Sequence, residues 1–126
     1  MLVSASAIVF SLLTGIVIIF QGCLAAGMKW GEASMGGKYP GKYPPKMRVV
    51  AIINMIILTF VAAIVVSHAE LILPQLKSIS NTGIWFVVAF FCVGTVLNTI
   101  TPSKIERIWA PVALVQTIAS IIVAIG

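Results

Sequence analysis

The sequence predicts an all-α membrane protein, a bundle of four transmembrane helices in antiparallel, up-and-down order with both termini outside. Hydrophobic residues make up 60% of the 126-residue chain and charged residues 9%, where soluble chains carry about 25% charged residues. Apolar stretches at about 2–27, 47–68, 83–100 and 103–125 are each close to the length that crosses a hydrocarbon core of about 30 Å. Lipid must therefore solvate much of the surface, and the whole chain is expected to form one membrane domain.

The first predicted helix, residues 2–27, contains no Lys or Arg. A cleaved signal peptide has a basic start and a short apolar core, so this stretch is interpreted as a true first span. A stripe of small residues favours close approach of another helix: Ser4, Ser11, Gly15, Gly22 and Ala26.

The predicted loop at 28–46 is the longest polar segment of the chain. It contains a tandem Gly-Lys-Tyr-Pro repeat beginning at Gly37, and such Gly and Pro residues set turns. Trp30, Tyr39, Tyr43 and the lysines are typical of an interfacial anchor that binds anionic lipid headgroups. The alternative is a lid that folds back over the helix ends.

After the second helix, residues 69–82 contain Pro74 and are predicted to lie in the interface. His68 and Glu70 form a His-x-Glu pair there. Two ligands without a third are a poor zinc site, so neither a metal nor another cofactor is expected.

The third and fourth helices are predicted to form a tight hairpin. Thr101-Pro102 ends the third helix, and Ser103 with Glu106 has the capping-box spacing that opens the fourth. Pro111 is expected to bend the entry of the fourth helix. A second stripe of small residues follows, with Gln116 beside it: Ala113, Thr117, Ser120 and Ala124. The two stripes predict close packing, either within one subunit or between subunits.

The distribution of positive charge predicts the orientation. With four spans, the first and third connections share one side of the membrane, and seven basic residues fall there: Lys29, Lys38, Lys42, Lys46, Arg48, Lys104 and Arg107. The other side carries only Lys77. The positive-inside rule then places both basic loops in the cytoplasm of a prokaryotic cell, with the spans in its plasma membrane. Basic residues in loops between spans do not indicate nucleic-acid binding.

Polar residues also gather at the predicted cytoplasmic depth. Polar groups inside a bilayer are costly unless they are paired, and they usually face the bundle interior. The candidate ligand-binding residues are Gln21, Trp30, Glu32, Arg48, Asn54, Asn98, Glu106 and Arg107. The arginines are expected to attract a solute, the amides to orient it, Glu32 to position the loop, and Trp30 to close the mouth. The alternative is that these groups only satisfy one another.

Several activities are disfavoured. No carboxylate lies in mid-span, which disfavours proton-coupled export. No Gly-x-x-x-x-Gly-Lys-Ser/Thr sequence is present, which disfavours phosphate binding through that loop. The single His lies far from the polar cluster, which leaves no obvious base for nucleophilic catalysis. Cys23 and Cys92 are expected at different depths, which disfavours a disulfide. No catalytic residue is assigned.

Paired motifs in the two basic loops carry a resemblance. They are Trp30-Gly31-Glu32 with Gly36-Gly37, the Pro44-to-Arg48 segment, Asn98 to Arg107 and Pro111-Val-Ala. Together they resemble a family of small bacterial four-helix membrane proteins. The chain departs from that family's pattern at Tyr43-Pro-Pro and at Thr101-Pro102. The resemblance implies the architecture and no particular activity.

The leading functional prediction is a membrane protein that binds or conducts a small polar or anionic solute through a pocket open to the cytoplasm, acting as a homo-oligomer or with a membrane-protein partner. One alternative is an accessory or scaffold subunit that docks on a larger membrane complex. A further alternative is a lipid-modifying enzyme that uses Glu32 and Glu106.

Overall fold

The computed structural model describes residues 2–33, 38–39, 41–69, 77–101 and 104–126, and it omits the side chains of Glu32 and Lys77. The elements in this part of the chain are all helical, with no strand among them. They are α1 (Leu2–Ala25), the short 3₁₀ turn η1 (Gly31–Ala33), α2 (Pro45–His68), α3 (Lys77–Ile100), the 3₁₀ turn η4 (Glu106–Ile108) and α4 (Trp109–Ile125). Four of them are long and apolar enough to cross a membrane. The prediction of an all-helical chain with four helices of membrane-spanning length and apolarity is thereby confirmed.

The ends of α1 and α2 follow from local backbone chemistry. Gly27 has a φ of +96°, the left-handed conformation that closes many helices. Its N–H donates to Leu24 O at 3.1 Å, and the N–H of Met28 donates to Cys23 O at 3.0 Å. This pair of bonds is the Schellman motif, and it ends α1 at Ala25 rather than near residue 27. At the other side of the loop, Pro45 occupies the first position of α2, where its missing N–H costs nothing.

The start of α3 differs from the prediction. The helix begins at Lys77 rather than at Gly83, so the later part of the expected interfacial segment 69–82 is helical. Gly83 lies within α3 and faces α2: a Cβ there would be 3.1 Å from Ile64 Cδ1. Ser80 is fully buried, and its Oγ is 3.2 Å from His68 Nδ1. Glu70 and Pro74 lie outside the described residues.

The entry of α4 also differs from the expected single helix over 103–125. Glu106–Ile108 forms a 3₁₀ turn, and the α-helix begins only at Trp109. Pro111 is therefore in the first turn of α4, where helices tolerate proline without a kink. Ser103 of the predicted capping box lies outside the described residues.

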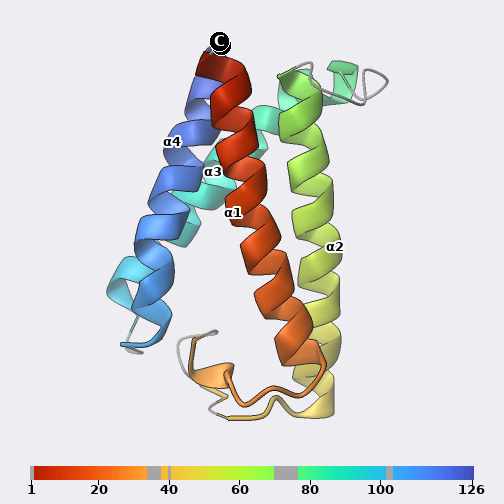
Figure 1. Ribbon diagram of the computed structural model, residues 1–126, viewed down its shortest axis with the longest axis vertical. Helices are drawn as coiled ribbons and strands as arrows, with labels where there is room; N and C mark the ends of the chain where they lie inside the picture. Colours follow the sequence, from red (N-terminus) through yellow and green to blue (C-terminus); the bar gives the residue numbers. More distant parts are fainter. Residues whose placement is uncertain (1, 34–37, 40, 70–76, 102–103) are drawn as a thin grey trace.

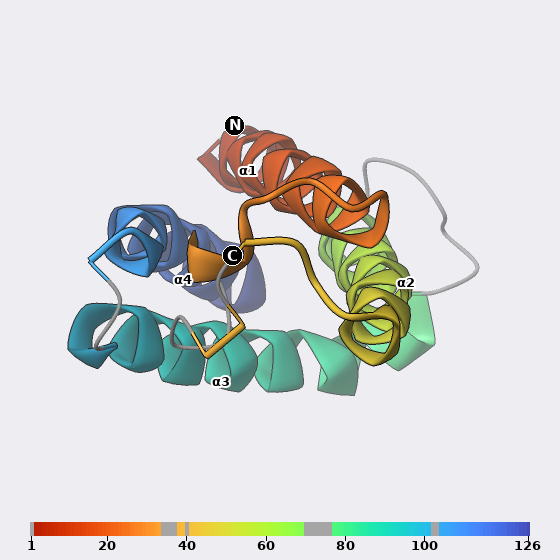
Figure 2. The same cartoon turned by 90° about the horizontal axis from the view of Figure 1, so that it is seen from below.

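The four helices form a ring in which each packs mainly against two neighbours (Figure 2), in the order α1, α2, α3, α4 and back to α1. At one end of the molecule, α1 ends beside the start of α2, and η4 and the start of α4 lie at that same end (Figure 1). We call it the loop end, because the α1–α2 loop passes beneath the ring there. At the opposite end, the C-terminal Gly126 lies against Val3 near the start of α1.

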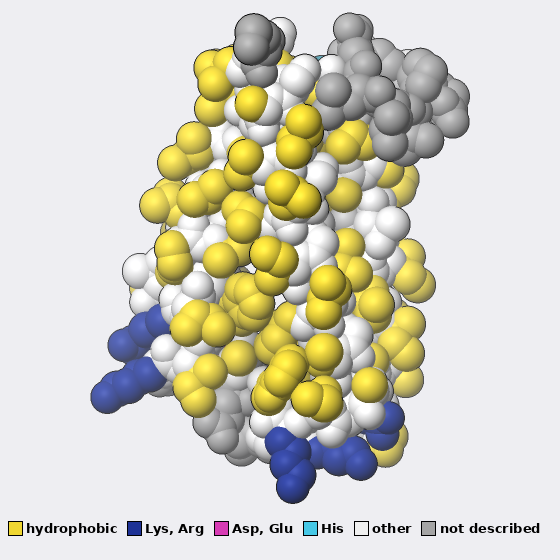
Figure 3. Space-filling view, viewed as in Figure 1, with side chains coloured by type: hydrophobic (Ala, Val, Ile, Leu, Met, Phe, Trp, Pro, Cys, Tyr) yellow, Lys and Arg dark blue, Asp and Glu magenta, His cyan; other side chains and the backbone are white. Residues whose placement is uncertain are grey.

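Large apolar side chains cover the outer surface along the helices (Figure 3). Examples with half or more of their surface exposed are Leu12, Ile16, Ile56, Phe60, Phe86, Phe90, Val96, Leu97 and Ile118. In contrast, Lys and Arg on the face shown gather around the loop end. An apolar girdle with a charged end is the surface that a bilayer solvates.

The interior contains an apolar core at the end away from the loop. Phe10, Val65 and Ile84 are fully buried within it. Phe10 and Phe91 meet edge to face, with ring centroids 5.0 Å apart. Below this core the packing becomes polar, and Gln116 Nε2 on α4 donates to Thr14 Oγ1 on α1 at 3.0 Å.

The two small-residue stripes pack differently inside the subunit. On α4, Ala113, Thr117 and Ser120 are buried, and Thr117 Oγ1 is 3.1 Å from Thr95 Oγ1 on α3. On α1, a Cβ at Gly15 would have no atom within 4 Å. A Cβ at Gly22 would be 3.3 Å from Met55 Cε on α2, so part of the α1 stripe meets α2. The buried positions of α1 include Phe10 and Thr14, and Thr14 is the residue that bonds to α4.

The Gln116–Thr14 hydrogen bond predicts a measurable coupling between α1 and α4. Comparing Gln116→Leu, Thr14→Val and the double variant should give an interaction energy of about 0.6 kcal/mol, and at most about 1.7 kcal/mol, the range found for interhelical hydrogen bonds in membranes. The measurement is the free energy of unfolding in mixed detergent–lipid micelles. Gln116→Leu with Thr59→Val is the matched control, since Thr59 Oγ1 bonds only within α2, to Met55 O. If the changes in the free energy of unfolding are additive for Gln116→Leu with Thr14→Val as well as for the control pair, the Gln116–Thr14 hydrogen bond is contradicted.

Candidate functional site

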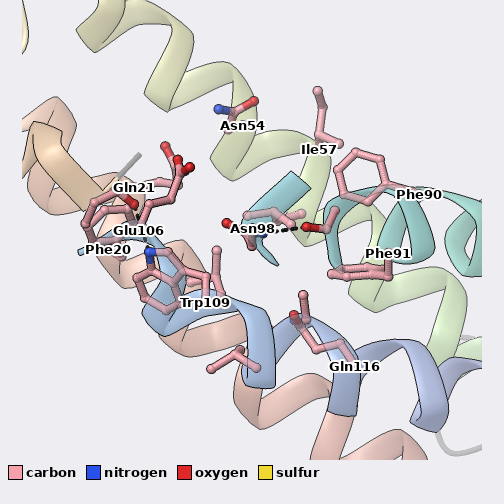
Figure 4. A pocket seen from close by; sticks show the side chains of 16 residues that line it. Phe20, Gln21, Asn54, Ile57, Phe90, Phe91, Asn98, Glu106, Trp109 and Gln116 are labelled. Carbon is pink, nitrogen blue, oxygen red and sulfur yellow. Dashed lines mark hydrogen bonds between the residues drawn. The ribbon is translucent and has the colours of Figure 1, made fainter. Parts of the chain in front are cut away.

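A cavity of about 250 Å³ lies toward the loop end, inside the ring of helices (Figure 4). All four long helices contribute to its wall, together with both 3₁₀ turns. Its lining comprises Val17, Phe20, Gln21, Ala33, Asn54, Ile57, Leu58, Phe90, Phe91, Gly94, Asn98, Glu106, Trp109, Val112, Ala113 and Gln116. Small-molecule sites are commonly about 300 to 1,000 Å³, so the space suits a solute at the small end of that range.

The structure brings four of the predicted site residues to this one cavity. Gln21 comes from α1, Asn54 from α2, Asn98 from α3 and Glu106 from η4. Gln21 and Glu106 are buried, with 9% and 8% of their surfaces exposed. Figure 4 shows Gln21 and Glu106 on one side of the space and Asn54 across from them, with Asn98 between. Polar groups from four separate elements thus share one interior space.

One amide side chain of the lining, that of Gln116, was missing from the predicted site. Gln116 is 2% exposed and lies at the inner end of the cavity, where it holds Thr14. The sequence carried a signal for it, because Gln116 stands beside the small-residue stripe of α4 and therefore faces the bundle interior.

An aromatic cluster lies where the cavity meets the loop. The Phe20 ring lies parallel to the Trp30 ring, with centroids 6.5 Å apart, and its centroid is 4.8 Å from that of Trp109. Trp109 Nε1 donates to Ala33 O at 2.9 Å. This hydrogen bond ties η1, in the α1–α2 loop, to the first residue of α4, which is 76 positions away in the sequence.

The described part of the loop is folded against the helix ends and is not merely spread along an interface. The N–H of Gly31 donates to Gly41 O at 2.8 Å, which closes the loop on itself. Tyr43 is 3% exposed and packs with Leu24, Met47 and Ala51 in a second small core. In Figure 2 the loop crosses below the space enclosed by the helices. This arrangement corresponds to the lid alternative.

The two predicted arginines lie outside the cavity wall. Arg48 Nε donates to Ala25 O at 2.7 Å, which satisfies a carbonyl at the end of α1. Arg107 is exposed, and its Nε donates to Thr101 O at 3.1 Å across the α3–η4 connection. Both guanidinium groups therefore brace backbone turns, and neither lines the space in which a solute would sit.

Trp30 and Glu32 are the two remaining predicted residues, and neither is in the described lining of the cavity. Trp30 lines a neighbouring apolar groove of about 480 Å³, which shares Phe20, Ala33 and Trp109 with the cavity wall. Glu32 belongs to η1, and its side chain lies outside the described residues.

The charge of the cavity is set by one group. Among the side chains that the structure describes, Glu106 is the only ionisable one in the lining. No three His, Cys, Asp or Glu side chains in the described ranges come close enough to hold a metal ion. Cys23 and Cys92 are both free thiols. The arrangement can therefore offer hydrogen bonds, aromatic faces and one carboxylate.

Asn98 illustrates how the wall is held in place. Its Nδ2 donates to Gly94 O at 2.7 Å, one turn back on α3, and Figure 4 shows this bond beside the cavity. The bond fixes the amide plane, so the side chain presents its polar edge to the interior and not to lipid. Preorganised polar groups of this kind lose little entropy when a ligand arrives.

Scans of protein-family models, curated proteins and solved structures find no match for this chain. What the cavity does must therefore be argued from its own residues.

The close approach of the Tyr39 backbone to Gly31 predicts that a glycine is needed there for the α1–α2 loop to pack against the helix ends. A Cβ at Gly31 would collide with the backbone carbonyl of Tyr39, and backbone yields less readily than a side chain. Gly31→Ala should release the loop and raise the rate of trypsin cleavage after Lys38 and Lys42 by several-fold in detergent. Gly15→Ala is the control, because its Cβ enters open space and should stabilise α1 by about 0.5–1 kcal/mol. Equal cleavage rates in Gly31→Ala and the unmodified protein would refute the docking.

Proposed function

We propose that this protein is a small integral membrane protein that binds a small polar solute in the cavity between its four helices. The observation that carries the proposal is that Gln21, Asn54, Asn98 and Glu106 line one space although they come from four elements. In a bilayer, polar side chains at such depth are rare and often mark a solute pathway. Mutual pairing alone would not need a hollow of about 250 Å³.

The proposed orientation places the loop end in the cytoplasm. The four helices cross the membrane antiparallel, up and down, with both termini outside, in the plasma membrane of a prokaryote. Support comes from the seven basic residues in the first and third connections, against Lys77 alone on the other side, because positive charge is retained on the cytoplasmic face. The exposed lysines of the loop end would also attract anionic lipid headgroups.

In this scheme the cavity opens toward the loop end and is closed toward the other. Phe91 lines the cavity, and Phe10 packs against it from the apolar core. Conduction across the membrane would require these two rings to separate, so the described state is a binding state. The loop and Trp30 act as the cover on the opposite side.

The structure shifts the proposed roles of individual residues. Arg48 and Arg107, expected to attract an anionic solute, donate to backbone carbonyls. Orientation of the solute then falls to the amides of Gln21, Asn54 and Asn98 and to the carboxylate of Glu106. Neither arginine that was expected to bind an anionic solute lines the cavity, so we propose a polar solute and not specifically an anionic one.

A second candidate function is an accessory subunit that docks on another membrane protein or on a copy of itself. The observation in its favour is the open space beside Gly15, where an added Cβ would have no atom within 4 Å. Cross-linking from Gly15→Cys in native membranes, in a background without Cys23 and Cys92, tests it. Cross-links to a single larger protein would favour this role over solute binding.

Loss of two amides tests the leading proposal. Asn54→Leu with Asn98→Leu should weaken solute binding by about 10- to 100-fold, because each hydrogen bond contributes about 0.5–1.5 kcal/mol. Binding is measured as thermal stabilisation of the purified protein by a panel of small amines, amides, alcohols and carboxylates, and flux is measured in proteoliposomes. Ile53→Leu with Leu97→Ile is the control on the neighbouring exposed positions. Unchanged binding and flux in the double Asn variant would exclude the cavity as the site.

Thiol labelling in intact cells tests the orientation. In a background without Cys23 and Cys92, Lys42→Cys should react with a membrane-impermeant maleimide only after the cells are permeabilised. Ile125→Cys should react in intact cells, because the termini are placed outside and Ile125 is 70% exposed. Labelling of Lys42→Cys from outside would reverse the proposed topology.

A further inference from the structure

We infer that the ligand of the cavity is a single-chain amphiphile, with a hydrogen-bonding head in the cavity and an alkyl chain in an apolar groove between α2 and α3. This inference rests on the proposed function, since the head is the polar solute that the cavity binds. It starts from the side of the ring on which the cavity wall opens to the surrounding lipid.

The opening lies between α2 and α3, which pack together least of the four neighbouring helix pairs. In Figure 1, α3 begins beside α2 at the end away from the loop and runs toward the start of α4, so the two helices separate as they approach the loop end. Ile57 of α2 and Phe90 of α3 line the cavity and are also 43% and 52% exposed. Figure 4 shows both side chains at one edge of the space. The cavity wall is therefore open on this side.

Gly94 provides free space just inside this opening. It lines the cavity, and a Cβ added to it would have no atom within 4 Å. Gly94 lies one helical turn from Phe90 and one turn from Asn98, so the free space joins the opening to the polar part of the wall.

An apolar groove of about 480 Å³ continues from the opening along the seam between the two helices. Phe90 lines both the groove and the cavity, so the two spaces adjoin. The groove wall includes Phe60, Val61, Ile64, Phe86 and Val87. Along α3 the groove reaches from Phe90 to Ile79, which is about 16 Å of helix at about 1.5 Å per residue. A long apolar space of this kind fits an alkyl chain.

The two spaces are arranged as head and chain are arranged in a lipid leaflet. The amides of the cavity lie toward the loop end, and the groove runs from Phe90 away from that end. In the proposed orientation the head is therefore near the cytoplasmic surface, and the chain points toward the bilayer centre. Moving a chain from lipid into the groove costs little, because lipid tails and apolar side chains are equally apolar.

The amides of the wall have hydrogen-bonding groups left for the head. Within the described part of the chain, the side chains of Gln21 and Asn54 make no hydrogen bond. Asn98 uses Nδ2 to hold Gly94 O, which leaves its carbonyl oxygen. Amides both donate and accept, and so do hydroxyl and amide groups of a ligand. The volume of about 250 Å³ admits a small head of this chemistry.

The other groove beside the cavity is at the wrong depth for the chain. Trp30 and Lys29 line it, and it lies at the loop end. In the proposed orientation that is the level of the lipid headgroups, whereas a chain attached to a head in the cavity extends toward the bilayer centre. One groove at the right depth therefore predicts a ligand with one chain.

Photolabelling of the full-length protein in lipid nanodiscs tests the inference. The probes are decanoylglycerol and decanoylethanolamine, each with a photoreactive diazirine in the middle of the chain. At least one probe should label Phe86 or Val87, and a tenfold excess of the same molecule without the diazirine should lower that labelling by about tenfold, as competition for one site requires. Leu12 is the internal control, because it is 66% exposed on α1 and reports the surrounding lipid. Its labelling should fall by less than about twofold.

Three competitors separate head from chain. Decane supplies the chain alone, whereas glycerol and N-acetylethanolamine supply the heads alone. Each should lower the labelling of Phe86 by less than about threefold at the same excess.

Gly94→Leu tests the connection between the two spaces, because the leucine side chain would fill the free space just inside the opening. It should reduce the competed labelling of Phe86 by about fivefold or more. Gly15→Leu is the matched control, since a Cβ at either glycine has no atom within 4 Å, and it should leave that labelling within about twofold of the unmodified protein. Full competition in a folded Gly94→Leu variant would overturn the connection and with it the inference.

The other outcomes separate the two levels of the proposal. If Phe86 and Leu12 lose equal shares of their label to the competitor, the groove holds only bulk lipid and the inference fails. It also fails if decane competes as well as the amphiphile, because no head is then recognised. If a head alone competes as well, the chain has no role, and the inference fails while the proposed function stands. The binding panel of small solutes decides the proposed function separately. The comparison of Phe86 with Leu12 in the unmodified protein is decisive even where Gly94→Leu does not fold.

Discussion

The structure depends on the rule that a polar group placed within a bilayer must find its partner inside the protein. Thr59, Thr95 and Thr117 obey it locally, because each hydroxyl donates to the carbonyl four residues earlier on its own helix. Gln116 obeys it across the bundle by donating to Thr14. The remaining amides and Glu106 cannot all do so by pairing within one helix, and they converge on a shared interior space. The cavity is therefore a consequence of where the sequence places its polar side chains.

The loop end is fixed by a small number of bonds that join distant parts of the chain. Arg48 on α2 satisfies the end of α1 through Ala25 O, and Trp109 at the start of α4 holds Ala33 in the loop. The close approach at Gly31 allows the loop to close on itself. Through these contacts the loop connects three helices and covers the side of the cavity that faces away from the apolar core.

Hydropathy alone predicted the class, because an apolar run long enough to span a bilayer has few alternatives. The depth of the amides was also predictable, since it follows from position along each helix. The start of α3 at Lys77 was not, because residues 77–82 are mostly polar and precede the apolar run that hydropathy detects. The roles of Arg48 and Arg107 depended on which carbonyls the folded turns leave unpaired. Likewise, no local sequence pattern predicted the hydrogen bond from Trp109 Nε1 to Ala33 O.

The central claim is that hydrophilic atoms face an interior space while their immediate neighbours face lipid. Two adjacent positions on α3 test it most directly: Asn98 lines the cavity, and Leu97 is 57% exposed on the outer surface. In membranes, and in a background without Cys23 and Cys92, Asn98→Cys should react with a small charged methanethiosulfonate reagent at least tenfold faster than Leu97→Cys. A solute that binds in the cavity should slow the first reaction and leave the second unchanged. Equal rates, or faster reaction of Leu97→Cys, would contradict the account.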